Sequence, residues 1–274
     1  DLTINAIAKA PDGTLIDPYG GQKDLADRLL RHVSDAFTED PLRILRLAQF
    51  QARLKGLGFR VHDLTTQLCR EMVARGDLDT LSRERVFKEL EKALSAPHPS
   101  EFFAVLASVN ALAQLFQGVE LAETKNLDRP ATDTSPPSRF SQLVLENPDL
   151  DLQGLNKQLA IPKHWLELAS MTRTWAAAFC QVTTLSADAI LAVLERGDAR
   201  RKPERFAQSV HISCQSLIID SAEQTQILGL WQRLVQETAK VSLPETASGL
   251  SGQDIKAMIR AEQLRRIEAT CDRN

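Results

Sequence analysis

The chain has 274 residues, of which 43% are hydrophobic and 25% are charged, as is typical of a globular protein with enough length for a sizeable core. These fractions exclude a disordered, collagen-like or membrane-spanning chain. The net charge of -3 excludes the strongly basic surface of a protein that holds nucleic acid without specificity, so any contact with RNA must be local.

The first residues predict a small β-hairpin. Apolar residues alternate from Leu2 to Ala6, a Pro-Asp-Gly turn follows at 11–13, and Leu15 and Ile16 continue the pattern. Because two short strands cannot form a stable domain, the hairpin is expected to complete a sheet whose other strands lie upstream.

The rest of the chain predicts α-helices. Apolar residues recur at helical spacing, and 12 glycines in 274 residues are too few for a fold built on many tight turns. Pro41 stands in the first turn of one expected helix, Ser82 is expected to cap the helix at 82–94, and His62 is interpreted as a helix cap. The expected helices cover residues 25–30, 41–54, 63–73, 82–94, 102–115, 150–159, 163–180, 188–196, 203–220, 223–241 and 252–269.

The cysteines and the longest apolar runs indicate the cellular location of the protein. Its four cysteines have no paired spacing of the kind found in zinc sites or short disulfide frameworks, so we expect reduced thiols. No apolar run approaches the ~18 to 20 residues of a membrane-spanning helix. We therefore expect a cytoplasmic protein with no membrane partner.

The most informative stretch begins at Asp40. With Pro41 in the first helical turn, Asp40, Arg43 and Arg46 follow one another at spacings of three and share one side of the helix. A carboxylate accepts from the exocyclic amine of cytosine or adenine, and a neighbouring guanidinium donates to the ring nitrogen or carbonyl. Such a pair could read a nucleotide without a template. The spacing equally suits an ordinary helix start, with Asp40 at the positive N-terminus and Arg43 in a surface salt bridge.

Several short motifs in one order resemble a known family. The motifs are Asp1-Leu2-Thr3-Ile4-Asn5-Ala6, Asp17-Pro18-Tyr19-Gly20-Gly21 with Asp24-Leu25, Leu30-Arg31-His32-Val33-Ser34, Glu39-Asp40-Pro41-Leu42-Arg43, Glu84-Arg85-Val86, Arg201-Lys202-Pro203-Glu204-Arg205-Phe206 and Leu250-Ser251-Gly252-Gln253-Asp254-Ile255. Together they are similar to the class II tRNA nucleotidyltransferases, the bacterial CCA-adding enzymes, from the middle of the head domain onward.

The resemblance implies a nucleotide-binding site. By this resemblance, Asp1 and Asn5 would lie beside the ribose. The spacing is compatible with that role, since positions i and i+4 of a strand face the same way. Asp40 and Arg43 would face the base of CTP or ATP, and Arg46 would support the nucleotide or its phosphates.

Four further residues are expected to support this site. Glu39 would orient the arginines, and Glu84 and Arg85 would brace the helical neck. Asp17 lies in a motif that the family links to a flexible loop and to movement of the head against the neck, although a plain turn also accounts for it.

The implied fold is mainly α: an elongated helical neck, body and tail after a small β-hairpin remnant of a nucleotidyltransferase head domain. The expected parts are the head remnant at 1–24, a nucleotide-selecting and RNA-binding neck and body at 25–117, a Pro-rich linker at 118–138, and a body and tail at 139–274. The last part resembles a degenerate phosphohydrolase region, because Leu145-Glu146 stands where a His-Asp metal-ligand pair is expected.

The resemblance also implies transfer chemistry with Mg²⁺, held by paired carboxylates after a Gly-Gly loop. The candidate carboxylate pairs at 77–79 and 149–151 lack a preceding strand or glycine pair. We therefore expect the metal carboxylates upstream of Asp1, and no catalytic residue or metal ligand in this chain.

Local basic clusters suggest where RNA would bind. We expect the acceptor and T arm of tRNA to contact Arg200, Arg201, Lys202 and Arg205, since A-form RNA is read mainly through phosphates, hydroxyls and shape. Solvated helix faces would give the same pattern. DNA is not an expected partner.

The predicted function is template-independent addition of C and A residues to the tRNA 3′ end from CTP and ATP. Alternatives within the same chemistry are a bacterial poly(A) polymerase and an enzyme that adds only CC or only A. An alternative of another class is a non-catalytic helical RNA-binding module.

Overall fold

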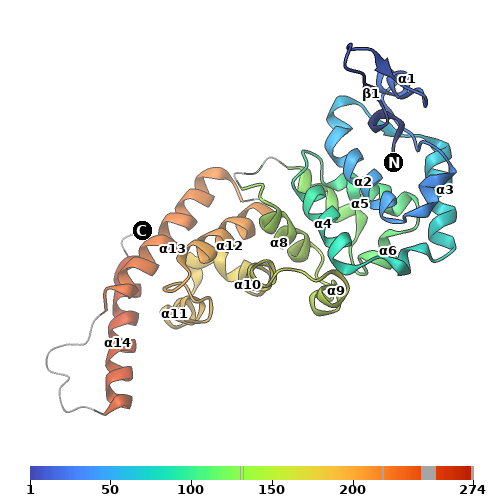
Figure 1. Ribbon diagram of the computed structural model, residues 1–274. Coiled ribbons are helices and arrows are strands. Elements are labelled where there is room, and N and C mark those ends of the chain that lie inside the picture. Colours follow the sequence, from blue (N-terminus) through green and yellow to red (C-terminus); the bar gives the residue numbers. More distant parts are fainter. Residues whose placement is uncertain (130, 132, 218, 242–250, 273–274) are drawn as a thin grey trace. The chain divides into compact units, whose positions relative to one another are not determined.

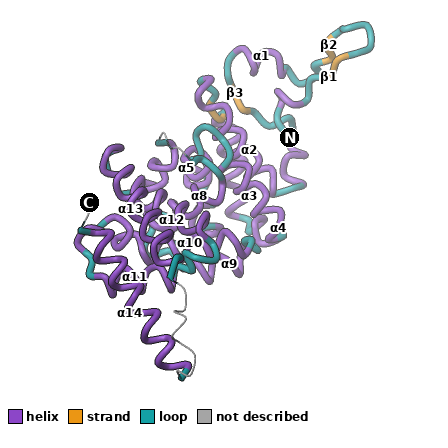
Figure 2. Tube along the Cα trace, turned by 90° about the vertical axis from the view of Figure 1, so that its left-hand side faces the viewer, coloured by secondary structure: helices purple, strands orange, loops and turns teal. Residues whose placement is uncertain are grey.

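The structure is a computed structural model that describes residues 1–129, 131, 133–217, 219–241 and 251–272 (Figure 1). The chain divides into two compact units, Asp1–Leu166 (unit 1) and Glu167–Asn274 (unit 2). Helices dominate both units, and the described strands all lie between residues 8 and 61 (Figure 2). The expectation of a mainly α fold with a small β element is confirmed.

The β-hairpin forms slightly later in the chain than the alternation predicts. Strands β1 (Ala8–Lys9) and β2 (Leu15–Ile16) pair antiparallel, with Ala8 opposite Ile16. The strand expected from Leu2 to Ala6 is wrong, because Thr3–Asn5 is a 3₁₀ helix. Leu2 is fully buried and bridges to His32, and the Asn5 N–H donates back to the Leu2 carbonyl at 3.0 Å. The chain therefore turns directly after the buried Leu2.

A second pair of strands was not expected. Helix α1 (Gly21–Ala26) ends early, Arg28 takes a left-handed φ of 56°, and β3 (Leu29–Leu30) pairs parallel with β4 (Arg60–Val61). Leu29 and Leu30 are buried in this arrangement. The helix expected at 25–30 is thus replaced by a strand whose partner lies about thirty residues further along the chain.

Unit 1 is built around α2 (Leu42–Leu54), which packs against α4 and α5. Its core holds Phe102, Phe103 and Phe116, whose rings meet edge to face at centroid distances of 5.3–6.0 Å. The remaining helices of this unit are α3 (Asp63–Ala74), α4 (Arg83–Leu94), α5 (Ser100–Ser108), α6 (Leu112–Leu115), α7 (Leu121–Thr124), α8 (Pro136–Glu146) and α9 (Leu152–Leu159).

Four features of unit 1 bear on the expected helices and linker. His62 caps α3, since its Nδ1 accepts the Leu64 N–H at 3.2 Å, as predicted. The expected cap at Ser82 is wrong, because its side chain makes no capping hydrogen bond at the start of α4. The single helix expected at 102–115 is divided into α5 and α6, because Asn110 adopts a left-handed φ of 63°. The stretch 118–138 contains α7 and the start of α8. The functional division of the chain at 24, 117 and 138 remains a prediction.

Unit 2 has its own aromatic core. Phe179, Phe206 and Trp231 meet edge to face at centroid distances of 5.2–5.8 Å, and the Trp231 indole N–H donates to the Phe179 carbonyl at 2.9 Å. The indole is therefore both buried and satisfied. The helices that contribute to this unit are α10 (Lys163–Cys180), α11 (Ala187–Arg196), α12 (Pro203–Ser216), α13 (Ser221–Ala239) and α14 (Gly252–Cys271).

A helix that spans a lipid bilayer must be both long and apolar. Across the ranges that the structure describes, no helix meets both requirements for a membrane span.

Two leucines test how unit 1 is held together. Leu45 on α2 is fully buried and Leu64 on α3 is 59% exposed. We expect Leu45→Ala to lower the free energy of unfolding by about 2–5 kcal/mol, because it leaves a cavity in the core. Leu64→Ala should stay within about 0.5 kcal/mol of the original chain. Urea unfolding followed by circular dichroism measures both, and equal losses would contradict this account of the core.

Candidate functional site

The predicted acidic and basic group lies where a 3₁₀ helix (Asp35–Glu39) gives way to α2. Asp40 has extended backbone at this junction, and its Oδ1 accepts the Leu42 N–H at 3.1 Å. Its carbonyl accepts the Arg43 N–H at 3.0 Å. The side chain thus satisfies an amide that has no partner within the helix. Asp40 therefore does act as an ordinary residue of a helix start, which is one of the two roles that its spacing allows.

The second oxygen of Asp40 accepts from Arg85 of α4. The Arg85 guanidinium lies 2.7 Å from Oδ2, and the two side chains are 48% and 34% exposed. Partial burial raises the pKa of Asp40, but the hydrogen bonds from Arg85 and the Leu42 amide, with the charges of Arg85 and Arg43, outweigh burial and hold the pKa below its usual value. An exposed pair of this kind contributes about 0–1 kcal/mol, so it can exchange partners.

The two arginines of α2 have separate partners. Arg43 donates to the Ala36 carbonyl, and Arg46 donates to a carboxylate oxygen of Asp1. The other oxygen of Asp1, Oδ1, is buried and has no hydrogen-bond partner among the residues described. The structure therefore joins Asp1, predicted to lie beside the ribose, to Arg46, predicted to support the nucleotide.

Asn5 does not lie on a strand with Asp1. It is exposed and belongs to the 3₁₀ helix Thr3–Asn5, so the expectation that Asp1 and Asn5 face the same way along a strand is wrong. The role of Asn5 at the ribose remains a prediction, independent of strand geometry.

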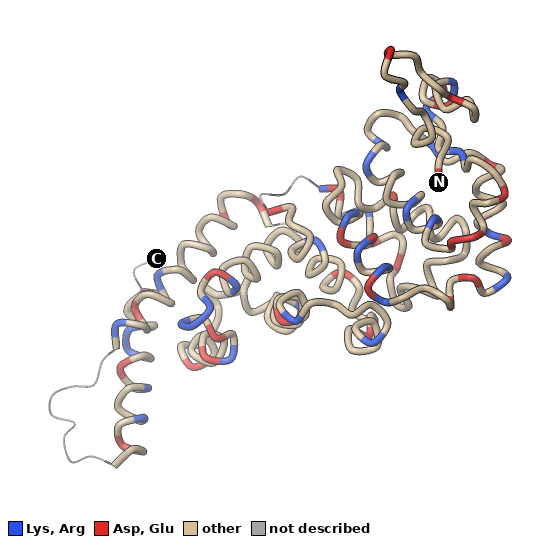
Figure 3. The backbone as a smooth tube through the Cα atoms, viewed as in Figure 1, with Lys and Arg blue, Asp and Glu red and all other residues tan. Residues whose placement is uncertain are grey.

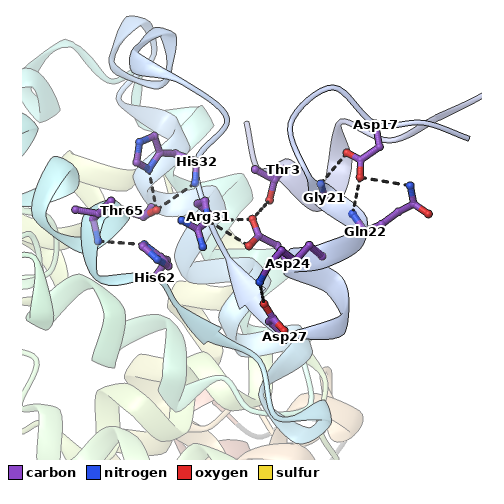
Figure 4. A network of polar contacts seen from close by, with 12 residues as sticks. Thr3, Asp17, Gly21, Gln22, Asp24, Asp27, Arg31, His32, His62 and Thr65 are labelled. Carbon is purple, nitrogen blue, oxygen red and sulfur yellow. Dashed lines mark hydrogen bonds and ion pairs between the residues drawn. The ribbon is translucent and has the colours of Figure 1, made fainter.

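The supporting residues differ in what they contact. Asp17 accepts the Gly21 N–H at 2.7 Å and the Gln22 N–H at 2.8 Å at the start of α1, and the hydrogen bond from the Gln22 amide lowers its pKa (Figure 4). Glu39 and Glu84 are exposed, and none of the ion pairs found in the described ranges joins either of them to an arginine.

A buried network beside the site was missed by sequence reasoning. Asp24 is 4% exposed, accepts from the Thr3 hydroxyl at 2.7 Å and pairs with Arg31 at 3.0 Å (Figure 4). Gly21 allows this approach, because a β-carbon there would lie 2.2 Å from the Thr3 carbonyl oxygen. Asp24 and Arg31 lie in or next to the family motifs, but no spacing rule pairs residues 3, 24 and 31.

A cavity of about 570 Å³ lies between α2 and α4. Arg46 lines it, but Asp40 and Arg43 do not. Phe50, Glu89 and Lys92 also line it, and sequence reasoning selected none of these three. They come together only because α2 packs on α4. The full lining is Arg46, Gln49, Phe50, Arg53, Glu89, Lys92, Ser95, Ala96 and Pro97.

The expected RNA-binding cluster lies at the start of α12, and acidic residues accompany it. Arg201 forms two hydrogen bonds to Asp198 at 2.8 and 2.9 Å. Lys202 and Arg205 share Glu167 at 2.9 and 2.6 Å, and Arg200 lines a second cavity of about 430 Å³. Figure 3 likewise shows basic and acidic residues interspersed along the helices. The RNA contact of this cluster remains a prediction.

The described side chains do not fit Mg²⁺. Within the residues whose placement the structure gives, no three His, Cys, Asp or Glu side chains are grouped as metal ligands. Asp77 and Asp79 lie in a 3₁₀ helix, and Asp77 pairs with Arg75 at 2.8 Å.

Comparison with known proteins gives consistent matches. Residues 58–122 match the family model described as "Probable RNA and SrmB- binding site of polymerase A". The chain is 37% identical to the multifunctional CCA protein of Pseudomonas putida, over 98% of this chain and 74% of that protein. It is 34% identical to the CCA-adding enzyme of Coxiella burnetii, over 98% of this chain and 70% of that protein.

Solved structures share the fold. The Bacillus stearothermophilus CCA-adding enzyme in complex with CTP aligns with a TM-score of 0.72 at 20% identity, over 98% of this chain and 68% of that one. The Thermotoga maritima CCA-adding enzyme complexed with tRNA_CCA aligns with a TM-score of 0.65 at 20% identity, over 100% and 71%. Fold and relatives together define a nucleotidyltransferase that acts on RNA. Within that class, the chain belongs to the CCA-adding enzymes.

The pairing of Asp40 with Arg85 can be tested by titration. We expect Arg85→Met to raise the pKa of Asp40 toward its ordinary value, because the change removes a hydrogen bond and a positive charge. A depressed pKa stabilises the fold above the ordinary carboxyl pKa, and that contribution is lost as pH falls through the folded pKa, so the two proteins should converge in stability in acid.

The measurement is an NMR titration of the Asp40 carboxyl carbon. Arg83→Met is the matched control, because Arg83 lies on the same helix and donates to the Asn156 carbonyl at 2.8 Å. An unchanged Asp40 pKa in Arg85→Met would show that the ion pair does not hold in solution.

Proposed function

We propose that this chain provides the nucleotide-selecting and RNA-holding parts of an enzyme that adds C and A residues to the tRNA 3′ end from CTP and ATP. The observation that supports it best is the meeting of Asp1 with Arg46, one helical turn after Arg43. The contact supports the proposal, because the residue expected at the ribose meets the helix that carries Arg43.

Base selection would use Asp40 and Arg43. When Arg85 releases Asp40, Oδ2 is free to accept from the exocyclic amine of C or A, while the Arg43 guanidinium donates to the neighbouring ring nitrogen or carbonyl. Uracil and guanine present a carbonyl where the amine would be, and a carboxylate repels that oxygen. The exchange is inexpensive, because both members of the Asp40–Arg85 pair are partly exposed.

Sugar selection would use Asp1. Its buried Oδ1 has an unused lone pair, and a ribose hydroxyl is a donor that can fill it. Arg46 fixes the orientation of this carboxylate through the other oxygen. Asn5, exposed nearby, would contact the sugar edge.

The reaction itself would be attack of the terminal RNA hydroxyl on the α-phosphorus of CTP or ATP. A new P–O bond forms to the RNA, the bond to the β-phosphate oxygen breaks, and pyrophosphate leaves. Mg²⁺ is assigned to none of the described residues. We further propose a cytoplasmic location, and contact between the tRNA acceptor arm and the cluster Arg200, Arg201, Lys202 and Arg205.

Arg43 provides the test of nucleotide selection. In the intact enzyme, we expect Arg43→Ala to reduce the preference for CTP and ATP over UTP and GTP by about tenfold, since one good two-point base contact contributes ~1–3 kcal/mol of discrimination. The rates of incorporation of each labelled nucleotide into tRNA lacking its 3′ end measure this preference.

Arg43→Lys is the matched variant, because it keeps the charge but loses the two-pronged donor, and it should resemble Arg43→Ala. An unchanged preference in both variants would contradict base reading by Arg43.

A further inference from the structure

The cationic face of α2 continues past the proposed base-reading pair. Arg43, Arg46, Phe50 and Arg53 stand at positions i, i+3, i+7 and i+10, so they form one stripe along the helix. At 1.5 Å per residue the stripe is about 15 Å long. A stacked strand rises only about 3.4 Å per base, so the stripe reaches beyond a single nucleotide.

The far end of this stripe lines the cavity between α2 and α4 and has the composition of a base-binding surface. The Arg53 guanidinium carbon lies 4.9 Å from the centroid of the Phe50 ring. Aromatic rings and guanidinium planes are surfaces on which unpaired bases stack. Lys92 and Arg46 line the same cavity with side chains 54% and 41% exposed, so both can meet a phosphate.

One wall of the cavity holds a carboxylate that is only half satisfied. Glu89 is 3% exposed, and its Oε1 accepts from Lys92 at 2.7 Å. Its Oε2 is buried and has no hydrogen-bond partner within the described ranges. Leaving a buried polar atom unpaired costs about 1–3 kcal/mol, and more for a charged group. A ligand that brings an N–H or O–H donor into the cavity would recover that cost.

We propose that this cavity binds the nucleotide already present at the 3′ end of the RNA. This inference rests on the proposed function. The base would stack on the Phe50–Arg53 surface, the phosphate would lie by Lys92 and Arg46, and Oε2 of Glu89 would accept from the exocyclic amine. Cytosine and adenine carry that amine, and uracil does not.

The position of Arg46 favours an RNA end over any other occupant. Arg46 contacts Asp1 in the proposed site of the incoming nucleotide and also lines this cavity. The attacking RNA hydroxyl must lie next to the incoming α-phosphate, so the two nucleotide sites must adjoin. A residue shared by both sites meets that requirement.

The test compares two short single-stranded RNAs that differ only in their last residue, C or U. Fluorescence anisotropy with the full chain and no nucleotide triphosphate measures their affinities. We expect the RNA ending in C to bind about tenfold more tightly. Glu89→Gln should abolish most of that preference, because its amide can donate to the O4 of uracil.

Two further variants make the result interpretable. Glu91→Gln, an exposed change on the same helix, should keep the preference. Phe50→Leu should weaken the binding of both RNAs by about tenfold, because stacking on the ring is lost. If thermal melting shows that Glu89→Gln does not fold, Phe50→Leu takes its place as the test.

The inference is overturned if the original chain binds the two RNAs equally or binds neither, or if folded Glu89→Gln keeps the full preference. A change in CTP affinity instead of RNA affinity in this variant would also overturn it, since the cavity would then serve the incoming nucleotide. Failure of the proposed function would be seen in a different experiment: the Arg43→Ala variant would keep its preference for CTP and ATP over UTP and GTP.

Discussion

The contact between Arg46 and Asp1 is the constraint on which the site depends. It joins residues 45 positions apart, and it connects the segment that precedes the β-hairpin to the central helix of unit 1. The Thr3–Asp24–Arg31 network holds the same segment from the other side. With both attachments in place, the Asp1 carboxylate has a fixed direction, and a fixed acceptor discriminates between ligands better than a mobile one.

Local chemistry was readable from the sequence. The helix after Pro41 and the cap at His62 depend on residues within one or two turns of each other, so their spacing was enough to predict them. The mainly α fold followed from apolar periodicity over long segments. The shared side of Arg43 and Arg46 on α2 was also visible in the spacing, although the partner of each arginine was not.

The parts that could not be predicted depend on contacts between distant residues. β3 forms as a strand because β4 is available beside it, and two leucines in an apolar run do not reveal that partner. Cys180 and Cys214 have no paired spacing, yet the fold brings their sulfur atoms to 3.7 Å. Glu89 looked like one of many acidic residues on a helix, because its burial and its unpaired oxygen arise only when α4 packs on α2.

Two carboxylates of unit 1 show how burial decides what a charged group can do. Both oxygens of Asp40 have partners, but the side chain is partly exposed, so water can replace Arg85 at little cost and the group is free to exchange one partner for another. Glu89 is the opposite case: its side chain is almost fully buried, and its second oxygen has no hydrogen-bond partner among the described residues. A group of the first kind suits repeated selection of an incoming ligand, since each cycle must break and remake its contacts. A buried carboxylate such as Glu89 suits a hydrogen-bond donor that stays bound for longer. The 3′ end of the RNA is such a ligand, because it stays in place while the next nucleotide is added.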